Sequence, residues 1–203
     1  VILPVLHKEE ERARVLEYCD SLKEELSKKS YMGLPIRVEI DKRDIRGGEK
    51  VWGWIKKGVP VRVEVGPRDV AQNAVFAARR DDGSKKSVGR EEFVETIADT
   101  LKSIQDSMFE RAKKYRDENT VEISSKDEFY SFFTPKNPKK PEIHGGFAVA
   151  YYDGSREVEE MLKSDLKVTV RCIPLEGGSE GGKCIFTGKS GAGVVKAVFA
   201  KSY

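Results

Sequence analysis

Apolar side chains follow a helical period near the start of the chain and a strand period shortly after it. In residues 8–29 they recur at steps of three and four among many Glu, Lys and Arg, at Val15, Cys19, Leu22 and Leu26. This spacing predicts an amphipathic helix that covers one face of a sheet. The strands of that sheet are expected at residues 1–6, 36–40, 61–65 and 73–80, with a short helix or turn around 50–57.

A long helix is expected after these strands. Asp82-Gly83 is a hairpin-like turn signal. Residues 90–119 then place one apolar stripe at helical spacing, made of Val94, Ile97, Leu101, Ile104 and Met108. Because strands alternate with helices, we expect an α/β domain over residues 1–120.

The second half of the chain predicts a smaller α+β domain. Ser125 and Glu128 fit a capping box for a helix over residues 126–133. The prolines of residues 135–141 favour an extended linker, so we assign residues 121–144 to a helix and linker. The domain itself is expected over residues 145–203. Its strands are predicted at 146–152, 168–174, 183–186 and 194–201, its helix at 155–163, and a flexible loop at 177–182.

Composition favours a soluble globular protein. The 203 residues carry 37 basic and 34 acidic side chains, a net charge of +3, so any functional positive charge must be local. No apolar run approaches the roughly 20 residues of a membrane helix and no signal peptide opens the chain, which favours a cytoplasmic location without a membrane partner. The three cysteines fit reduced thiols. The apolar start, without Met, is typical of an interior strand and indicates an excised fragment.

Residues 61–65 carry the most informative chemistry. Apolar and charged side chains alternate, so Arg62 and Glu64 share the face of the strand that the valines do not use. Gly66-Pro67 should end this strand and leave Arg68 and Asp69 exposed. Together these donors and acceptors could read a planar base edge.

Further cations and two tryptophans lie near this strand in sequence. Trp52 or Trp54 could offer a stacking surface. Phosphates could be neutralised by Lys56, Lys57, Arg79, Arg80, Lys85 and Lys86. The alternative is that all these charges are simply solvated on a strand face. Elsewhere, neither His7 nor His144 has neighbours typical of a catalytic base or metal ligand, and no nucleophile or phosphate-loop motif is present, so we predict no catalytic residue.

A series of short motifs, in order, covers nearly the whole chain. They are Val1-Ile-Leu-Pro-Val-Leu6, Asp41-Lys-Arg-Asp44, Trp54 ahead of Lys57-Gly-Val-Pro60, Gly66-Pro-Arg-Asp69, Arg79-Arg-Asp81, Arg171-Cys-Ile-Pro-Leu175, Gly182-Lys-Cys-Ile185 and Tyr203. In this order they closely resemble the C-terminal part of the prolyl-tRNA synthetases of the eukaryote- and archaea-like type. The resemblance implies a mixed-sheet anticodon-binding domain of the class II synthetase type, followed by a unit similar to the family's zinc-binding domain.

The resemblance also implies roles for particular residues. Arg62, Arg68 and Asp69 match family positions that contact the two guanines of the proline anticodon, and we add Glu64 because it shares the strand face. Two family positions differ here: Val51 replaces an aromatic residue and Ile55 replaces a glutamate. Base stacking and one carboxylate contact are therefore in doubt.

Activity is expected only of the full-length enzyme. The family is a proline–tRNA ligase that joins proline to tRNA(Pro) through prolyl-adenylate, with ATP and Mg²⁺ bound in a catalytic domain upstream. Its motifs are absent here, so the fragment alone should be inactive and hold no cofactor. The resemblance further implies a cytoplasmic homodimer with no DNA partner. The carboxylate of Tyr203 would reach towards the active site.

The zinc site of many relatives is not expected in this chain. Its four cysteine positions correspond to Asp153, Val158, Cys184 and Thr187. Structural zinc needs about four Cys or His ligands, so one thiol and one carboxylate cannot complete the site. We therefore predict no metal.

Three alternatives to this interpretation remain open. The chain could be a free-standing anticodon-binding-like module for another RNA or a protein. It could be a small-molecule enzyme that uses the crevice at its strand ends, although the convergent polar groups for this are not evident. The C-terminal unit could also be purely structural, bracing the other domains, which is compatible with the main interpretation.

Overall fold

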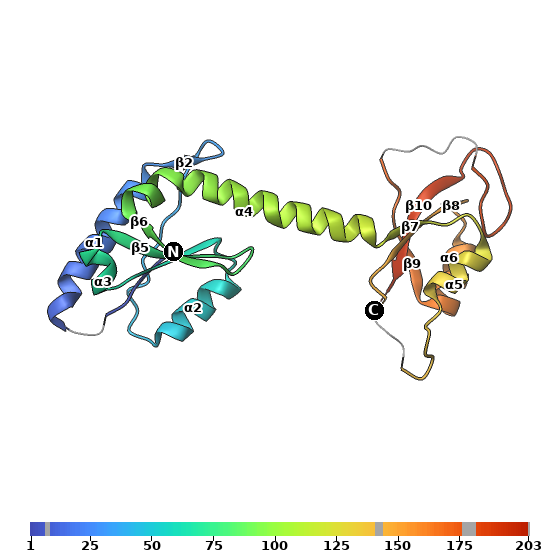
Figure 1. Ribbon diagram of the computed structural model, residues 1–203. Coiled ribbons are helices and arrows are strands. Elements are labelled where there is room, and N and C mark those ends of the chain that lie inside the picture. Colours follow the sequence, from blue (N-terminus) through green and yellow to red (C-terminus); the bar gives the residue numbers. More distant parts are fainter. Residues whose placement is uncertain (7–8, 141–143, 176–181, 203) are drawn as a thin grey trace. The chain divides into compact units, whose positions relative to one another are not determined.

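The computed structural model describes residues 1–6, 9–140, 144–175 and 182–202 (Figure 1). It consists of two compact units, Val1–Arg111 and Ala112–Tyr203. The division falls inside one long helix, and each unit has a hydrophobic core of its own.

The first unit is a four-stranded mixed sheet with helices. Its elements are β1 (Ile2–Pro4), α1 (Glu9–Ser27), β2 (Ser30–Tyr31), β3 (Leu34–Pro35), α2 (Gly47–Lys56), β4 (Val61–Val65), α3 (Pro67–Ala71), β5 (Ala74–Arg79), β6 (Lys85–Gly89) and α4 (Arg90–Glu118). The sheet order is β1-β4-β5-β6, with β1 parallel to β4 and the other neighbours antiparallel. The predicted mixed α/β architecture is confirmed.

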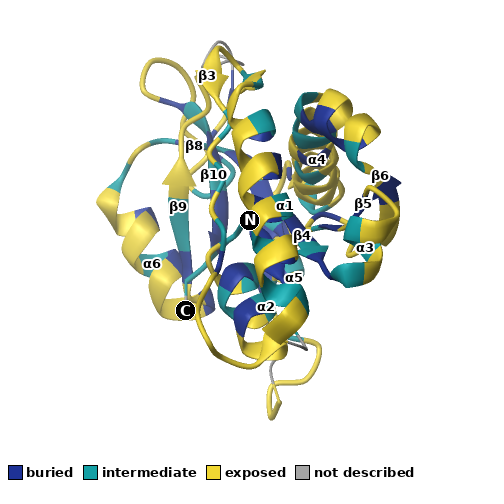
Figure 2. Ribbon diagram, turned by 90° about the vertical axis from the view of Figure 1, so that its left-hand side faces the viewer, coloured by how far each residue is buried: buried dark blue, intermediate teal, exposed yellow. Residues whose placement is uncertain are grey.

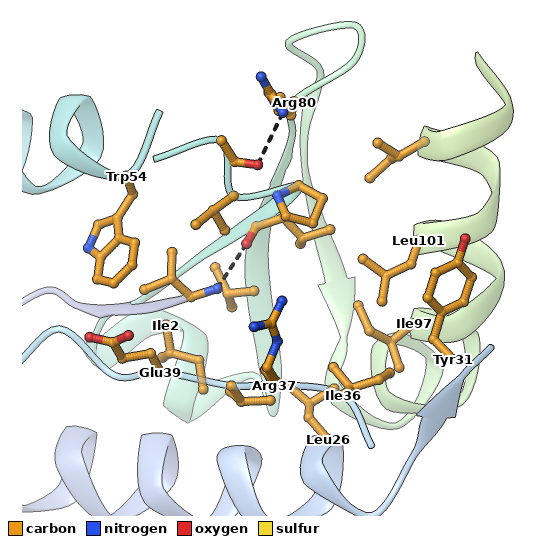
Figure 3. Close-up of a pocket in the computed structure, with 18 of the residues that line it drawn as sticks. Ile2, Leu26, Tyr31, Ile36, Arg37, Glu39, Trp54, Arg80, Ile97 and Leu101 are labelled. Carbon is orange, nitrogen blue, oxygen red and sulfur yellow. Dashed lines mark hydrogen bonds between the residues drawn. The ribbon is translucent and has the colours of Figure 1, made fainter. Parts of the chain in front are cut away.

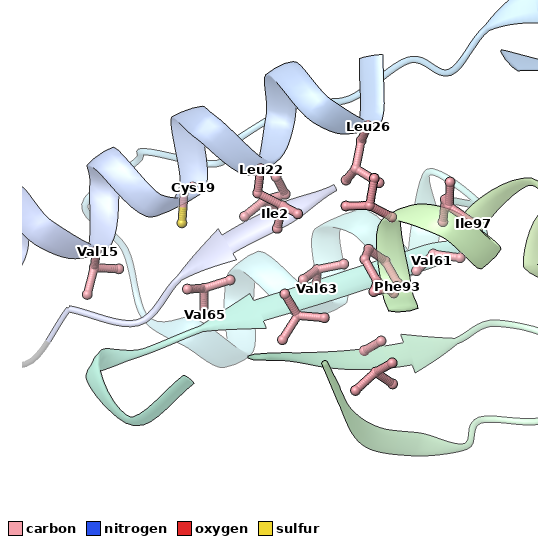
Figure 4. Packing of buried hydrophobic residues seen from close by; sticks show 14 of the residues in the cluster. Ile2, Val15, Cys19, Leu22, Leu26, Val61, Val63, Val65, Phe93 and Ile97 are labelled. Atoms are coloured by element: carbon pink, nitrogen blue, oxygen red, sulfur yellow. The ribbon is translucent and has the colours of Figure 1, made fainter. Parts of the chain in front are cut away.

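The core of this unit lies between the sheet and two helices, α1 and α4. Figure 4 shows Val15, Cys19, Leu22 and Leu26 of α1 pointing toward the valines of β4, as their three- and four-residue spacing predicts. Burial raises the pKa of Cys19 to about 12, so this thiol stays protonated and acts as a small core side chain. All three cysteines are free, as expected.

Residues 36–40 do not form the predicted strand. Ile36, Val38 and Ile40 do pack against the core, but the backbone pairs with β1 only through a single bridge between Ile2 and Ile40. The ladder does not continue, because its next donor would be Pro4, which has no N–H. Conversely, β6 was not predicted, because its Lys-Lys-Ser-Val-Gly composition lacks the usual strand pattern and it pairs only as an edge strand.

Helix α2 is anchored by a buried carboxylate. Asp41 is 3% exposed and accepts a hydrogen bond of 2.8 Å from Nε1 of Trp54. Arg43 donates to both oxygens of Asp41 through Nε and a terminal nitrogen, and Nζ of Lys50 donates to its backbone carbonyl. The hydrogen bonds from Arg43 and Trp54 hold the pKa of Asp41 well below its usual range. The carboxylate thus stays ionised and fully satisfied although buried.

The second unit is a four-stranded sheet with two helices. Its elements are β7 (Thr120–Glu122), α5 (Lys126–Phe133), β8 (Phe147–Tyr152), α6 (Arg156–Leu166), β9 (Val168–Cys172) and β10 (Val195–Lys201). The sheet order is β7-β8-β10-β9. The Phe129 and Phe199 rings meet edge-on at 5.2 Å in its core. On α6 the buried residues Val158, Leu162 and Leu166 form one stripe, and the other face is exposed (Figure 2).

Several predictions for this unit are confirmed. Ser125 caps α5, since its Oγ accepts from the backbone N–H of Glu128 at 3.2 Å. The Glu128 carboxylate accepts from the N–H of Ser124, one residue earlier than a capping box requires. The helix expected at 155–163 begins as predicted and extends to Leu166.

Other predictions for this unit are wrong or lie outside the described residues. Residues 183–186 do not form a strand, because they pair only through one bridge between Lys183 and Ser190 and then turn. Within residues 121–144, assigned to a helix and linker, the helix is α5 as expected, but most of β7 also lies there and joins the sheet of this unit. Most of the loop at 177–182 lies outside the described residues. The limits proposed for the functional domains stay a prediction.

Within the described part of the chain, no helix combines the length and the apolar character that crossing a membrane requires.

We predict that Trp54→Phe destabilises the first unit by about 1–3 kcal/mol, because the buried Asp41 carboxylate loses a hydrogen bond and the indole volume is not refilled. Urea denaturation followed by circular dichroism measures the change. The matched control is Trp52→Phe, because Trp52 is 60% exposed on the same helix and should leave the midpoint unchanged. Equal midpoints for the two variants would contradict the anchoring role.

Candidate nucleic-acid interface

The candidate interface is the sheet face of the first unit that α1 and α4 do not cover. Side chains of β4, β5 and β6 form two cross-strand rows on it. One row contains Arg62, Ala78 and Lys85, and the next contains Glu64, Phe76 and Ser87. The sequence predicted the shared face of Arg62 and Glu64 but not their neighbours, because the register becomes known only when the strands pair.

Arg62 is buried, contrary to the expectation that this face is free. Its side chain is only 6% exposed, although it lies on the face of β4 that α1 and α4 leave uncovered. Its Nε is buried without a hydrogen-bond partner. Among the described residues its terminal nitrogens also have no partner, and they are not fully shielded from solvent. Arg62 is therefore a buried guanidinium whose N–H donors have no hydrogen-bond partner among the described residues. This is unusual because buried polar atoms are nearly always paired.

Glu64 lines a cavity beside the sheet. The cavity has a volume of about 310 Å³ and lies between the end of β1, the segment after Asp41 and α2. Val51 and Lys50 of α2 line it together with Leu3 and Arg12. The Glu64 carboxylate is half-buried and forms no salt bridge with Arg62 or any other described residue. One of the two altered family positions, Val51, therefore lies in the same cavity as Glu64.

Arg68 and Asp69 lie in the first turn of α3 rather than at a free strand end. Pro67 occupies the first helical position, where its missing N–H costs nothing. Asp69 accepts a hydrogen bond of 2.8 Å from the N–H of Gly66 and so caps this helix. Arg68 is exposed and has no partner among the described residues. Asp69 thus has a structural task, whereas Arg68 is available for a ligand.

Two of the predicted phosphate-binding arginines are engaged within the protein. Arg79 forms two hydrogen bonds with Asp81, of 3.0 and 2.9 Å, and a third with Ser103 at 3.1 Å. The hydrogen bonds from Arg79 lower the pKa of Asp81 to about 2. Arg80 donates to the carbonyl of Gly58 at 3.1 Å. These contacts favour a structural task for Arg79, because its Nε and one terminal nitrogen are already engaged by Asp81 and Ser103.

The predicted lysines are all exposed but do not share one face. Lys85 and Lys86 follow each other on β6, so only Lys85 lies on the face of Arg62. Nζ of Lys57 lies 4.0 Å from the centre of the Trp54 ring. Because Trp54 is buried, its expected stacking role is wrong, and only Trp52 of the two remains accessible.

A larger cavity of about 800 Å³ opens elsewhere in the first unit (Figure 3). Its walls are mainly apolar, with Ile2, Leu26, Ile97 and Leu101 among them. None of the residues predicted to read bases lines this cavity. Two of those predicted to bind phosphates, Lys57 and Arg80, do line it. The predicted chemistry therefore belongs to the smaller cavity and the sheet face.

In the second unit, Asp153 is hydrogen-bonded to Thr187, and both are among the four positions that the resemblance aligns with zinc ligands. Its Oδ1 accepts from the N–H and Oγ of Ser155, at 3.1 and 2.6 Å. Its Oδ2 accepts from Oγ1 of Thr187 at 2.9 Å, and Nζ of Lys189 lies 3.5 Å away. These hydrogen bonds, led by that from Ser155, lower the pKa of Asp153 to about 2.

The other two positions are buried, Val158 in the core and Cys184 beside it. Across the described residues, no three His, Cys, Asp or Glu side chains come together as metal ligands would. The donor set present does not fit structural zinc, which needs more thiolate or imidazole ligands. Tyr203 lies outside the described residues.

Comparison with known proteins assigns both halves of the chain. The family model described as the anticodon binding domain matches residues 1–100, and the model described as prolyl-tRNA synthetase, C-terminal, matches residues 139–203. The chain belongs to the prolyl-tRNA synthetase family. The resemblance found in the sequence motifs is thereby confirmed.

Individual synthetase relatives match the whole chain. Proline–tRNA ligase 2 of Anaeromyxobacter dehalogenans is 50% identical over 209 residues, and the proline–tRNA ligase of Protochlamydia amoebophila is 49% identical over 206 residues. That of Rhodopirellula baltica is 43% identical over 203 residues. Each alignment covers 100% of this chain but only 39–40% of the relative. The chain thus spans about two-fifths of the length of these synthetases and corresponds to the anticodon-binding and C-terminal domains.

We predict that Asp153→Asn destabilises the second unit of this synthetase region by about 1–2 kcal/mol at neutral pH. Because folding lowers the pKa of Asp153 from 3.8 to about 2, its ionised form stabilises the fold above about pH 4. That contribution is lost as the pH falls towards 2, so the variant should depend less on pH in this window.

Thermal unfolding between pH 2 and 7 measures this difference. Glu160→Gln is the control, because the Glu160 salt bridge with Arg156 is exposed and worth little. Parallel pH profiles for wild type and Asp153→Asn would contradict the assignment.

Proposed function

We propose that this chain recognises the anticodon of tRNA(Pro) as part of a proline–tRNA ligase. The observation that carries the proposal is the guanidinium of Arg62, buried on an interior strand with unmet donors. Its enclosed Nε stays unpaired at a cost of about 1–3 kcal/mol, whereas its terminal nitrogens are not fully shielded and can donate to a ligand acceptor. A guanine offers such acceptors in its O6 and N7 atoms.

Glu64 supplies the complementary acceptor. Its carboxylate would accept hydrogen bonds from the N1–H and N2 amino groups of a second guanine, and the cavity of about 310 Å³ beside it is large enough for a purine. Anticodon loops expose these base edges because their nucleotides are unpaired. In this arrangement Glu64 takes over the carboxylate contact for which Ile55 has no oxygen. The apolar side chain of Val51 packs on the base without stacking.

Exposed cations would hold the RNA backbone. Lys56, Lys57 and Lys85 have no salt-bridge partner among the described residues and can neutralise phosphates, whereas Arg68 is assigned to a base by the family resemblance. Such contacts are not base-selective and weaken with salt. Asp69 and Arg79 contribute by holding α3 and the β5–β6 turn, rather than by touching RNA.

The reaction belongs to the whole enzyme. In this proposal the ligase joins proline to tRNA(Pro) through prolyl-adenylate, with ATP and Mg²⁺ in a catalytic domain that this chain does not include. The chain contributes no catalytic residue, holds no zinc, and works in a cytoplasmic homodimer with no DNA partner. The names of the relatives support this role, and the carboxylate of Tyr203 is assigned towards the active site by family resemblance alone.

The test is binding of this chain to an anticodon stem-loop with the proline anticodon, against a loop whose two guanines are replaced, at one fixed salt concentration. We expect wild type to prefer the guanines. Arg62→Met should lose about tenfold of that preference, because it keeps the packed stem but removes the donors. Its thermal stability should not fall, since the orphaned Nε is removed with them.

Lys86→Met is the matched control. It removes one positive charge from the opposite face of the sheet, so both loops should bind slightly more weakly and the preference should persist. Arg68→Ala should weaken the guanine loop selectively if Arg68 reads a base, and both loops equally if it contacts phosphate. Equal binding of both loops by wild type would overturn guanine recognition by this domain.

A further inference from the structure

Phe76 is an exposed aromatic side chain in the middle of the candidate interface. It lies on β5, an interior strand, yet 36% of its surface is exposed. It belongs to neither hydrophobic cluster of the described residues. Its neighbours on the same strand face, Ala74 and Ala78, are too small to cover the ring. The ring therefore contributes little to the core and leaves apolar surface in water.

The surroundings of Phe76 are polar and charged. Glu64 and Ser87 lie directly across from it on the neighbouring strands, and Arg62 and Lys85 lie diagonally. Since neighbouring strands are about 4.8 Å apart, all four side chains are within reach of a group placed on the ring. Neither Arg62 nor Lys85 has an ion-pair partner among the described residues.

This combination fits a nucleotide better than an apolar peptide. A base can stack on the ring while its phosphate meets a lysine or arginine. An aliphatic side chain on the ring would instead cover Arg62, Lys85 and Glu64 with apolar surface and leave their charges unpaired, which is costly. The charge pattern around Phe76 thus selects a single-stranded nucleic acid as its occupant.

We propose that Phe76 is a platform on which one unpaired RNA base stacks, next to the guanines read by Arg62 and Glu64, with Lys85 at its phosphate. This inference rests on the proposed function, because the RNA is taken to be the anticodon loop. Every base has a stacking face, so the platform raises affinity without selecting a sequence. Discrimination and affinity would then come from neighbouring but separate residues of one sheet face.

Phe76→Ala tests the platform in the full chain. It should weaken binding of the proline stem-loop and of the guanine-replaced loop by the same factor, about tenfold. Phe76→Tyr should restore binding, because its ring stacks equally well. The unfolding midpoint of Phe76→Ala should fall only modestly, since the ring lies outside the core cluster although most of it is covered.

A fluorescent base gives a second readout. With 2-aminopurine beside the anticodon guanines, wild type should quench the fluorescence by stacking, and Phe76→Ala should not. Phe109→Ala is the control, because Phe109 is exposed on α4 of the same unit and should change neither signal. Unchanged affinity and quenching in Phe76→Ala would overturn the platform, as would a loss confined to the guanine loop.

The outcomes also separate this inference from the proposed function. If wild type binds both loops equally and Phe76→Ala weakens both, guanine reading fails and the platform stands. If Arg62→Met loses the guanine preference and Phe76→Ala changes nothing, the platform fails and the proposed function stands. Binding of neither loop by wild type would overturn both.

Discussion

The buried carboxylate of Asp41 is the contact on which the candidate interface depends. It joins α2, through Trp54, to the segment that follows the first helix and hairpin. Helix α2 is short and only part of its surface is apolar, so apolar packing alone would hold it weakly against the rest of the unit. With α2 in place, Lys50 and Val51 form one wall of the cavity that Glu64 lines. One wall of the cavity beside Glu64 thus depends on a hydrogen bond that touches no RNA.

Strand β4 joins stability and binding in one element. Its valines fill the core, while the side chain of Arg62 is enclosed on the other face with an unpaired Nε. A protein selected only for stability would place an apolar residue there, since that removes an unpaired buried donor. In the proposed function the terminal nitrogens of this guanidinium donate to the ligand, and the enclosure of the side chain limits the conformational entropy lost on binding.

In the second unit, a hydrogen-bond network around Asp153 occupies positions that the sequence resemblance aligns with the family's zinc site. Asp153 links the turn before α6 to Thr187 and Lys189, which are distant in sequence. Its lowered pKa shows that the fold favours the ionised carboxylate. Around it, the aromatic cluster of Phe129, Phe133 and Phe199 supplies the apolar packing. Apolar packing and one local carboxylate network thus both contribute to the described part of this unit.

Local pattern determined the long helices and the central strands, and the order of short motifs along the chain indicated the family. The spacing of Val15 to Leu26 and the alternation of residues 61–65 each require only neighbouring residues, so they were readable from the sequence. Tertiary structure decided what depends on distant partners: the single bridge at Ile40, the pairing of β6, the burial of Arg62 and the exposure of Phe76. Alternation assigns a side chain to a face, but only the strands and helices packed around that face determine whether it is covered.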